Sequence, residues 1–202
     1  MLLSIGAGIP CMGQNALDIE VSMRVRNAPL RMTLVRLADS HRVSFLLDRR
    51  VDPGQPVSLE LQALPLHAAF DRVAEHAEIQ TLTVGESVYL GPEQGVIALE
   101  QSLERTAQKL SALSPTIRRR YRRQAETHWP DATEPRAILN EMLAGQNLRL
   151  SSPANVPHDL WPAGSLSQAP LCDRLSLLLV GFGLDWMPDP EAPNSVLVFG
   201  HE

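Results

Sequence analysis

The chain has 202 residues, 44% of them hydrophobic and 20% charged, which is typical of a globular protein of one domain or two small ones. Its net charge of −5 argues against a dedicated nucleic-acid-binding protein, because such proteins usually carry an excess of basic residues. Two cysteines make no disulfide framework. No apolar run reaches the roughly 18 residues that predict a transmembrane helix.

The N-terminal segment 1–16, MLLSIGAGIPCMGQNA, contains no charged side chain. It has the character of the apolar part of a secretory leader, with Cys11 and Gly13 as small residues at positions that signal peptidases favour. The basic stretch that usually opens a leader is missing, and a disordered tail is the alternative. We therefore expect a periplasmic or exported protein, or a cytoplasmic one if this segment is not a leader.

A first module is predicted over residues 18–92. Alternating apolar residues predict a strand over 18–26, and apolar residues at helical spacing predict a helix over 30–40. Strands are expected at 43–47 and 57–61, on either side of a turn at 52–55. Pro65 suits the first position of a second helix, since the first N–H groups of a helix have no partner within it. Residues 79–90 have the pattern of a closing hairpin.

A helical connector is predicted over residues 93–126, where apolar residues recur at steps of three and four. Ser114 and Pro115 have the pattern of a helix start, which favours two shorter helices over one long helix.

A second module is predicted over residues 127–200, with weaker strands. Strands are expected at 127–129, 147–150 and 164–166, the last one poor, and helices at about 135–144 and 170–182. Residues 184–187 and 195–199 would close the module. The fold class predicted is therefore α+β, with two small β-α-β-β-α-β-type modules joined by a helical connector.

The two modules share an apolar pattern when the sequence is shifted by 105 residues. Phe45 then meets Leu150, and Pro65 and Leu66 meet Pro170 and Leu171. Identical pairs are few, so the pattern of expected burial carries the comparison. Such self-similarity at a fixed period predicts an internal duplication, the same structural unit built twice.

The first module carries motifs of a known family. They are a strand, a proline–leucine helix start, V-x-F and V-x-L-x-L strands, a second proline–leucine helix start and a hairpin. In this chain they lie at 21–25, Pro29-Leu30, 43–45, 57–61, Pro65-Leu66 and 79–90. This run resembles the short domain at the N-terminus of secretins and TonB-dependent transporters (the STN domain). The second module would be a degenerate copy.

The resemblance implies a non-catalytic interaction domain of the bacterial envelope, with an envelope protein as its partner and no cofactor. The sequence itself shows no catalytic, cofactor-binding or metal-binding signature: histidines lack metal-ligand spacing and no nucleophile elbow is present. Within such a protein, the regular first strand (19–25) is the edge expected to pair with a strand of a partner.

Two segments are candidate interaction sites. The first is an arginine cluster over 118–123, comprising Arg118, Arg119, Arg120, Arg122 and Arg123. It suits an anionic ligand, which makes anionic-ligand or nucleic-acid binding the alternative function, although nucleic acid is disfavoured by the acidic chain. The alternative is that the arginines form a solvated helix face without a binding role, with Ile117 and Tyr121 as the buried side of the helix.

The second candidate is Trp161, in the unusually apolar segment 157–162. Tryptophan is enriched at binding hot spots, which favours an exposed anchor for a partner protein. The alternative favoured by the sequence is that this side chain closes the side of a small core.

Overall fold

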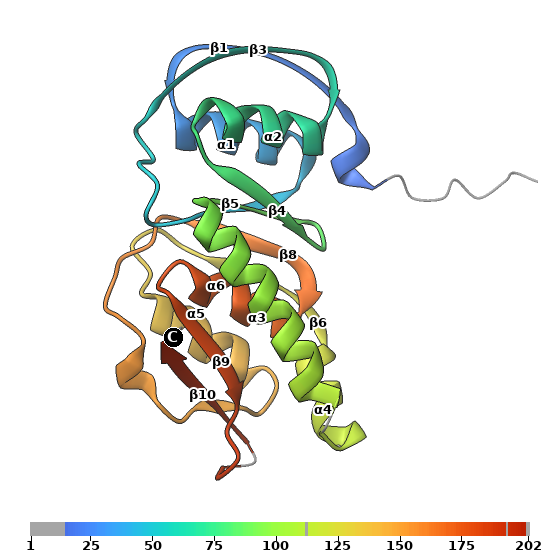
Figure 1. Cartoon of the computed structure of the whole chain (residues 1–202), viewed down its shortest axis with the longest axis vertical. Helices are drawn as coiled ribbons and strands as arrows, with labels where there is room; N and C mark the ends of the chain where they lie inside the picture. Colours follow the sequence, from blue (N-terminus) through green and yellow to red (C-terminus); the bar gives the residue numbers. More distant parts are fainter. Residues whose placement is uncertain (1–14, 112, 193, 201–202) are drawn as a thin grey trace, which may run out of the picture.

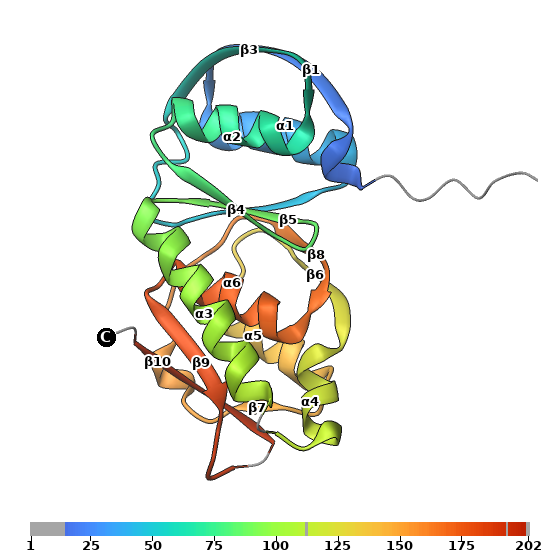
Figure 2. The same cartoon turned by 45° about the vertical axis from the view of Figure 1, so that its right-hand side comes forward.

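Sheets and helix pairs alternate in layers along the long axis of the molecule (Figure 1, Figure 2). The structure is a computed structural model that describes residues 15–111, 113–192 and 194–200. It has the α+β class predicted. The leader predicted at 1–16 lies outside the described residues except for Asn15 and Ala16, which begin a short 3-10 helix, η1 (Ala16–Asp18).

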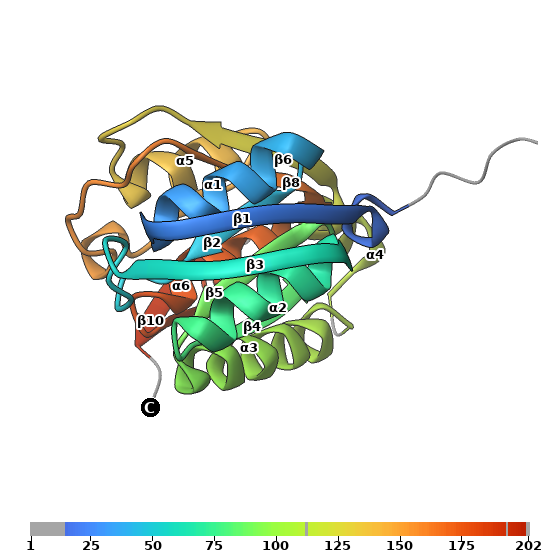
Figure 3. The ribbon, with the colours of Figure 1, turned by 90° about the horizontal axis from the view of Figure 1, so that it is seen from above.

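The first module surrounds two helices with two sheets. Strands β1 (Glu20–Pro29) and β3 (Pro56–Pro65) form an antiparallel ribbon over helices α1 (Leu30–His41) and α2 (Leu66–His76), as Figure 3 shows. On the other side of the helices lies a sheet of order β2-β5-β4, made by β2 (Ser44–Leu47), β5 (Ser87–Gly91) and β4 (Gln80–Val84). Strand β2 is parallel to β5, and β4 is antiparallel to it.

The second module has the same order and the same pairings. Its ribbon is β6 (Gln124–Trp129) with β8 (Gly164–Pro170), and its helices are α5 (Pro135–Ala144) and α6 (Leu171–Val180). Its sheet has the order β7-β10-β9, from β7 (Arg149–Leu150), β10 (Ser195–Gly200) and β9 (Leu184–Pro188). A short 3-10 helix, η2 (Pro153–Asn155), follows β7. Again the first strand is parallel to the central one and the last strand is antiparallel.

The period of 105 residues is visible in the backbone. Helices α1 and α5 begin at residues 30 and 135, and α2 and α6 begin at residues 66 and 171. Left-handed backbone conformations recur at the same interval, in the pairs Asn27 and Ala132, Arg42 and Asn147, and Glu78 and Gly183. Side chains other than glycine rarely adopt positive φ, so these pairs indicate that the chain makes the same turns twice.

Several predicted boundaries are wrong in detail. Pro65 and Pro170 do not begin their helices: each ends a strand, with φ near −55° (−53° and −55°), and the helix starts at the next residue. The strand predicted at 164–166 extends to Pro170, and the second module begins at Gln124, inside the predicted connector. Strand β8 tolerates Gly164 because the ring of Trp129 fills the space beside it: a Cβ there would lie 2.6 Å from that ring.

The connector forms two helices, α3 (Glu93–Ser111) and α4 (Pro115–Arg122), which confirms the break predicted at Ser114. Helix α3 descends from the first sheet along α6 (Figure 1). Gly95 permits its close approach to that sheet, because a Cβ there would lie 2.4 Å from the hydroxyl oxygen of Tyr89.

The sheet β2-β5-β4 is shared by two hydrophobic cores. Val88 and Leu90 on one face belong to the core around α1 and α2, whereas Leu46, Val84 and Tyr89 belong to the core of the second module and α3. All five side chains are buried. The two modules are therefore stacked through a common layer, and the ribbon of the second lies on the sheet of the first.

Serine side chains make the polar part of this contact. The Ser44 and Ser165 hydroxyls lie 3.1 Å apart, the Ser44 N–H donates to Ser167 Oγ, and the Ser167 N–H donates to Ser87 Oγ, both at 3.2 Å. Small side chains let β8 lie close against β2 and β5.

Candidate interaction pocket between the modules

The arginine cluster lies on α4 and just after it, with Tyr121 buried beneath it. The Tyr121 ring stacks on that of Trp186 at a centroid distance of 5.5 Å, and Ile117 packs against the same core. Burial raises the Tyr121 pKa to about 12. The burial predicted for Tyr121 is thus confirmed, whereas Ile117 is only half-buried.

The arginines themselves differ in their contacts. Arg120 Nη1 donates to Asn194 Oδ1 (2.6 Å) and Arg118 Nη1 to the Ser111 carbonyl (3.4 Å). Arg119, Arg122 and Arg123 are exposed, and within the described part of the chain their side chains have no hydrogen-bond or ion-pair partner. These three charges are available to solvent or to an anionic ligand.

Trp161 is half-buried and held from several directions. Its backbone forms a two-way bridge with Thr133, and its indole N–H donates to Asp159 Oδ2 (3.2 Å). Its ring stacks on Phe182 at 5.7 Å and lies 6.0 Å from the ring of Trp129. Both sequence interpretations describe part of this arrangement, since Trp161 packs against the second core and also lines a pocket.

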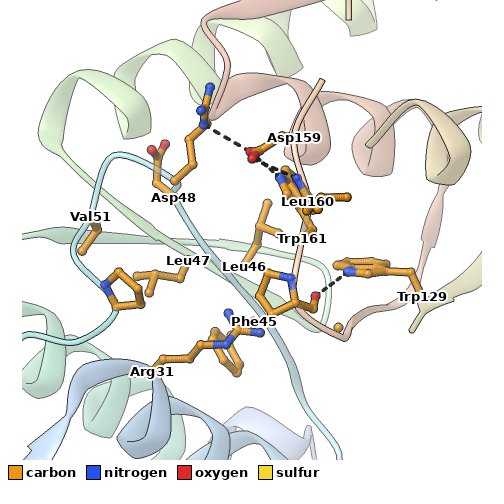
Figure 4. A pocket seen from close by; sticks show the side chains of 14 residues that line it. Arg31, Phe45, Leu46, Leu47, Asp48, Val51, Trp129, Asp159, Leu160 and Trp161 are labelled. Carbon is orange, nitrogen blue, oxygen red and sulfur yellow. Dashed lines mark hydrogen bonds and ion pairs between the residues drawn. The ribbon is translucent and has the colours of Figure 1, made fainter. Parts of the chain in front are cut away.

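That pocket, the inter-module pocket, has a volume of about 250 Å³ and lies where the modules meet (Figure 4). Strand β2 and the loop after it form one wall, and the segment 159–164 with Trp129 forms the other. Its lining residues are Arg31, Phe45, Leu46, Leu47, Asp48, Arg49, Val51, Pro53, Trp129, Asp159, Leu160, Trp161, Pro162 and Gly164. None of the cluster arginines is among them.

Hydrophobic surface is exposed at the rim. Leu160 is 65% exposed, the highest value among the large hydrophobic side chains of the described residues. The Trp129 indole N–H donates to the Pro162 carbonyl (2.9 Å), which fixes the aromatic wall beside it. Aromatic side chains are enriched at protein interfaces, so the tryptophan wall suits contact with a partner, with Leu160 beside it.

Both carboxylates of the pocket are paired with arginines. Asp159 forms an ion pair with Arg49 at 3.4 Å. Asp48 is fully buried and accepts hydrogen bonds from Arg50 Nε (2.9 Å) and Nη2 (2.7 Å), and from the Tyr89 hydroxyl. Burial and the Asp48 carboxylate raise the pKa of Tyr89, while the charge of Arg50 acts in the opposite direction.

Arg31 is the pocket cation without such a pair. Its Nη2 donates to the Ala163 carbonyl (3.0 Å), and its guanidinium carbon lies 5.8 Å from the centre of the Phe45 ring. Burial lowers its pKa, while the charge of Asp131 acts in the opposite direction. No carboxylate of the described residues lies within 4 Å of the guanidinium nitrogens.

Sequence reasoning did not identify Arg31, Phe45, Trp129 or Leu160 as site residues. The apolar segment 157–162 was a usable signal, and so was the turn at 52–55, which places Pro53 in the wall. The pocket itself has no local pattern, because it arises where residues far apart in sequence meet across the two modules.

No protein-family model matches the chain, and no curated protein matches it. Among the described residues no helix is both long and apolar enough to span a membrane. Across 15–111, 113–192 and 194–200, no three His, Cys, Asp or Glu side chains gather in a way that would hold a metal ion.

Proposed function

We propose that this chain is a non-catalytic, exported protein–protein interaction protein of the secretin and TonB short-domain type, with an envelope protein as its partner. The repeated strand pairing and the repeated left-handed turns support an internal duplication of one such module. The order of elements, each proline that precedes a second helix and the closing hairpins agree with the motifs of the resemblance.

The inter-module pocket carries the proposal. Stacking of the modules leaves a small aromatic-walled hollow beside the exposed Leu160. Interfaces take most of their binding energy from a few such anchored contacts. The pocket takes one wall from each module, so a single module could not form it.

Photo-crosslinking in the native host tests this function. A photoreactive residue at Leu160 is expected to give one discrete protein adduct in the envelope fraction. The same residue at Ile97, which is 44% exposed on α3, is the matched control and should give none. Equal labelling at both positions, or none at Leu160, would contradict the proposal.

Strand β1 offers a second contact surface. It has one partner only, β3, so its other edge is unpaired among the described strands. Leu66 N donates to the Ile19 carbonyl (2.9 Å), so residue 19 faces β3. The register irregularity between Val21 and Met23 adds its extra residue to β3, so the alternation continues along β1 and directs the N–H groups of Ser22 and Arg24 away from β3. An added strand would bind there.

Proline substitution tests the edge. Ser22 Oγ accepts a hydrogen bond from Ala63 N, so Arg24→Pro is the cleaner change, with Arg24→Ala as control. We expect the proline variant alone to lose capture of the crosslinked partner while its circular dichroism stays unchanged. Retained capture would exclude strand addition at β1.

Export is tested separately by sequencing the N-terminus of protein isolated from its native host. We expect a shortened chain in the periplasmic fraction, because the uncharged segment 1–16 suits a leader. A cytoplasmic product that begins at Met1 would overturn the envelope assignment.

A second candidate function is binding of an anionic ligand by the arginine cluster. Arg119, Arg122 and Arg123 favour it, because they are exposed and their side chains have no hydrogen-bond or ion-pair partner among the described residues. Flotation with anionic lipid vesicles or a mobility shift with DNA would show binding that weakens steeply with salt. Binding that Arg119→Gln with Arg122→Gln abolishes would place the function on this cluster.

A further inference from the structure

We propose that the inter-module pocket binds the C-terminal residue of a partner chain, with a large apolar side chain between the walls and its α-carboxylate on Arg31. This inference rests on the proposed interaction function and specifies its ligand. The chemistry required is an aliphatic or aromatic side chain and a carboxylate on one residue.

The size of the pocket limits the ligand. Its 250 Å³ lies below the roughly 300–1,000 Å³ of pockets that hold drug-sized molecules. One amino-acid residue is the part of a protein that suits this space. Leu47, Pro53 and Trp161 provide apolar surface on both sides, as Figure 4 shows for Leu47 and Trp161.

The charge balance of the pocket calls for an anion. Asp159 is paired with Arg49, and Asp48 is neutralised by Arg50 from outside the lining. Arg31 is left as a half-buried cation whose hydrogen-bond partner is a neutral carbonyl, and the charge of Asp131, which is outside the lining, acts on it only from beyond ion-pair distance. A guanidinium in this position gains most from a carboxylate, because charge-assisted hydrogen bonds are about twice as strong as neutral ones.

The side chain of Arg31, and not the start of α1, has to supply the donors. The first two N–H groups of that helix are already bonded, Leu30 N to the Gln55 carbonyl (2.8 Å) and Arg31 N to the Pro53 carbonyl (3.0 Å). A single residue with both an apolar side chain and a carboxylate is a C-terminal one, whereas an internal segment needs two residues for the same groups.

The test is an NMR titration of the full protein with three peptides. They are N-acetyl-glycyl-glycyl-leucine as the free acid, the same peptide as the amide, and an internal arm, N-acetyl-leucyl-glutamyl-glycinamide. The indole N–H signals of Trp129 and Trp161 report on the pocket. Trp186, which is 1% exposed and donates to Ser176 Oγ, is the internal control.

We expect the free acid to shift the Trp129 and Trp161 signals with a dissociation constant of about 1 mM, as suits so small a ligand. The amide and the internal arm should bind at least about ten-fold more weakly than the free acid. Arg31→Gln should weaken acid binding to the same extent, Arg31→Lys less so, and Arg72→Gln, an exposed arginine paired with Glu75, not at all.

Three results would overturn the inference: no shift at either indole, equal binding of acid and amide, or equal binding of the internal arm. The acid–amide comparison uses the unmodified protein and holds even if Arg31→Gln does not fold. A Leu160 crosslink without binding of the free-acid peptide refutes this ligand and leaves the proposed function standing. Binding of the free-acid peptide without a crosslink refutes the proposed protein partner and leaves the carboxylate site standing.

Discussion

The shared sheet predicts that damage to either core unfolds both modules together. Phe70 on α2 and Leu175 on α6 occupy equivalent positions, 105 residues apart, and both are 0% exposed. Truncation to alanine leaves a cavity and removes buried apolar surface, at a cost of about 3–5 kcal/mol for phenylalanine and about 2–5 kcal/mol for leucine. For a protein of this size each variant should melt roughly 4–20 °C lower.

The tryptophans make the test selective. All three, Trp129, Trp161 and Trp186, belong to the second module, so their fluorescence reports on that module and on its contact with the first, whereas far-ultraviolet circular dichroism follows both modules as a whole. Since Leu46, Val84 and Tyr89 of the first sheet lie in the second core, Phe70→Ala should shift both denaturation curves equally. Two separate transitions, with fluorescence unmoved by Phe70→Ala, would refute the coupling; a loss below about 0.5 kcal/mol would mean that the side chain is not a core residue.

Further predictions concern single groups. Burial raises the pKa values of both tyrosines, Tyr121 to about 12, so the folded protein should show no phenolate absorbance at pH 10. The contribution of the tyrosines to stability should be complete below the unfolded tyrosine pKa of about 10 and should be lost as pH rises from there through the folded pKa values. Burial raises the Cys172 pKa to about 12, so in a variant whose other cysteine is serine a thiol reagent should react only after unfolding. Gly164→Ala places a Cβ 2.6 Å from the Trp129 ring, so it should cost about 1–3 kcal/mol in a denaturant titration and move the Trp129 indole signal.

The apolar pattern predicted the order of elements because each strand and helix buries a face with its own period. The third strand of the second module was underestimated, since Gly164 and Pro162 look like strand breakers in sequence. In the structure the Trp129 ring occupies the place of the missing Cβ, and the Pro162 carbonyl accepts its indole N–H. Trp129 and Pro162 are 33 residues apart, so this compensation leaves no trace in a local sequence pattern.

The candidate site was predicted only in part, for the same reason. Sequence composition pointed to Trp161, and helical spacing placed Tyr121 inside and the arginines outside, which the structure confirms for Tyr121. The role of Arg31 could not be predicted from the sequence, because its lack of an ion pair among the described residues depends on which acids meet which arginines after the modules stack.

The stacking of ribbon on sheet is directional, and the two ribbons differ at a residue that makes this contact. In the second ribbon Ser165 lies against the preceding sheet, and the equivalent residue of the first ribbon, 105 positions earlier, is Glu60. Glu60 forms an exposed ion pair with Arg24, at 3.7 Å, on the face where a preceding sheet would lie. Covering that face would strip two charges of water, so the first ribbon is a less favourable surface than the second ribbon for stacking on a sheet.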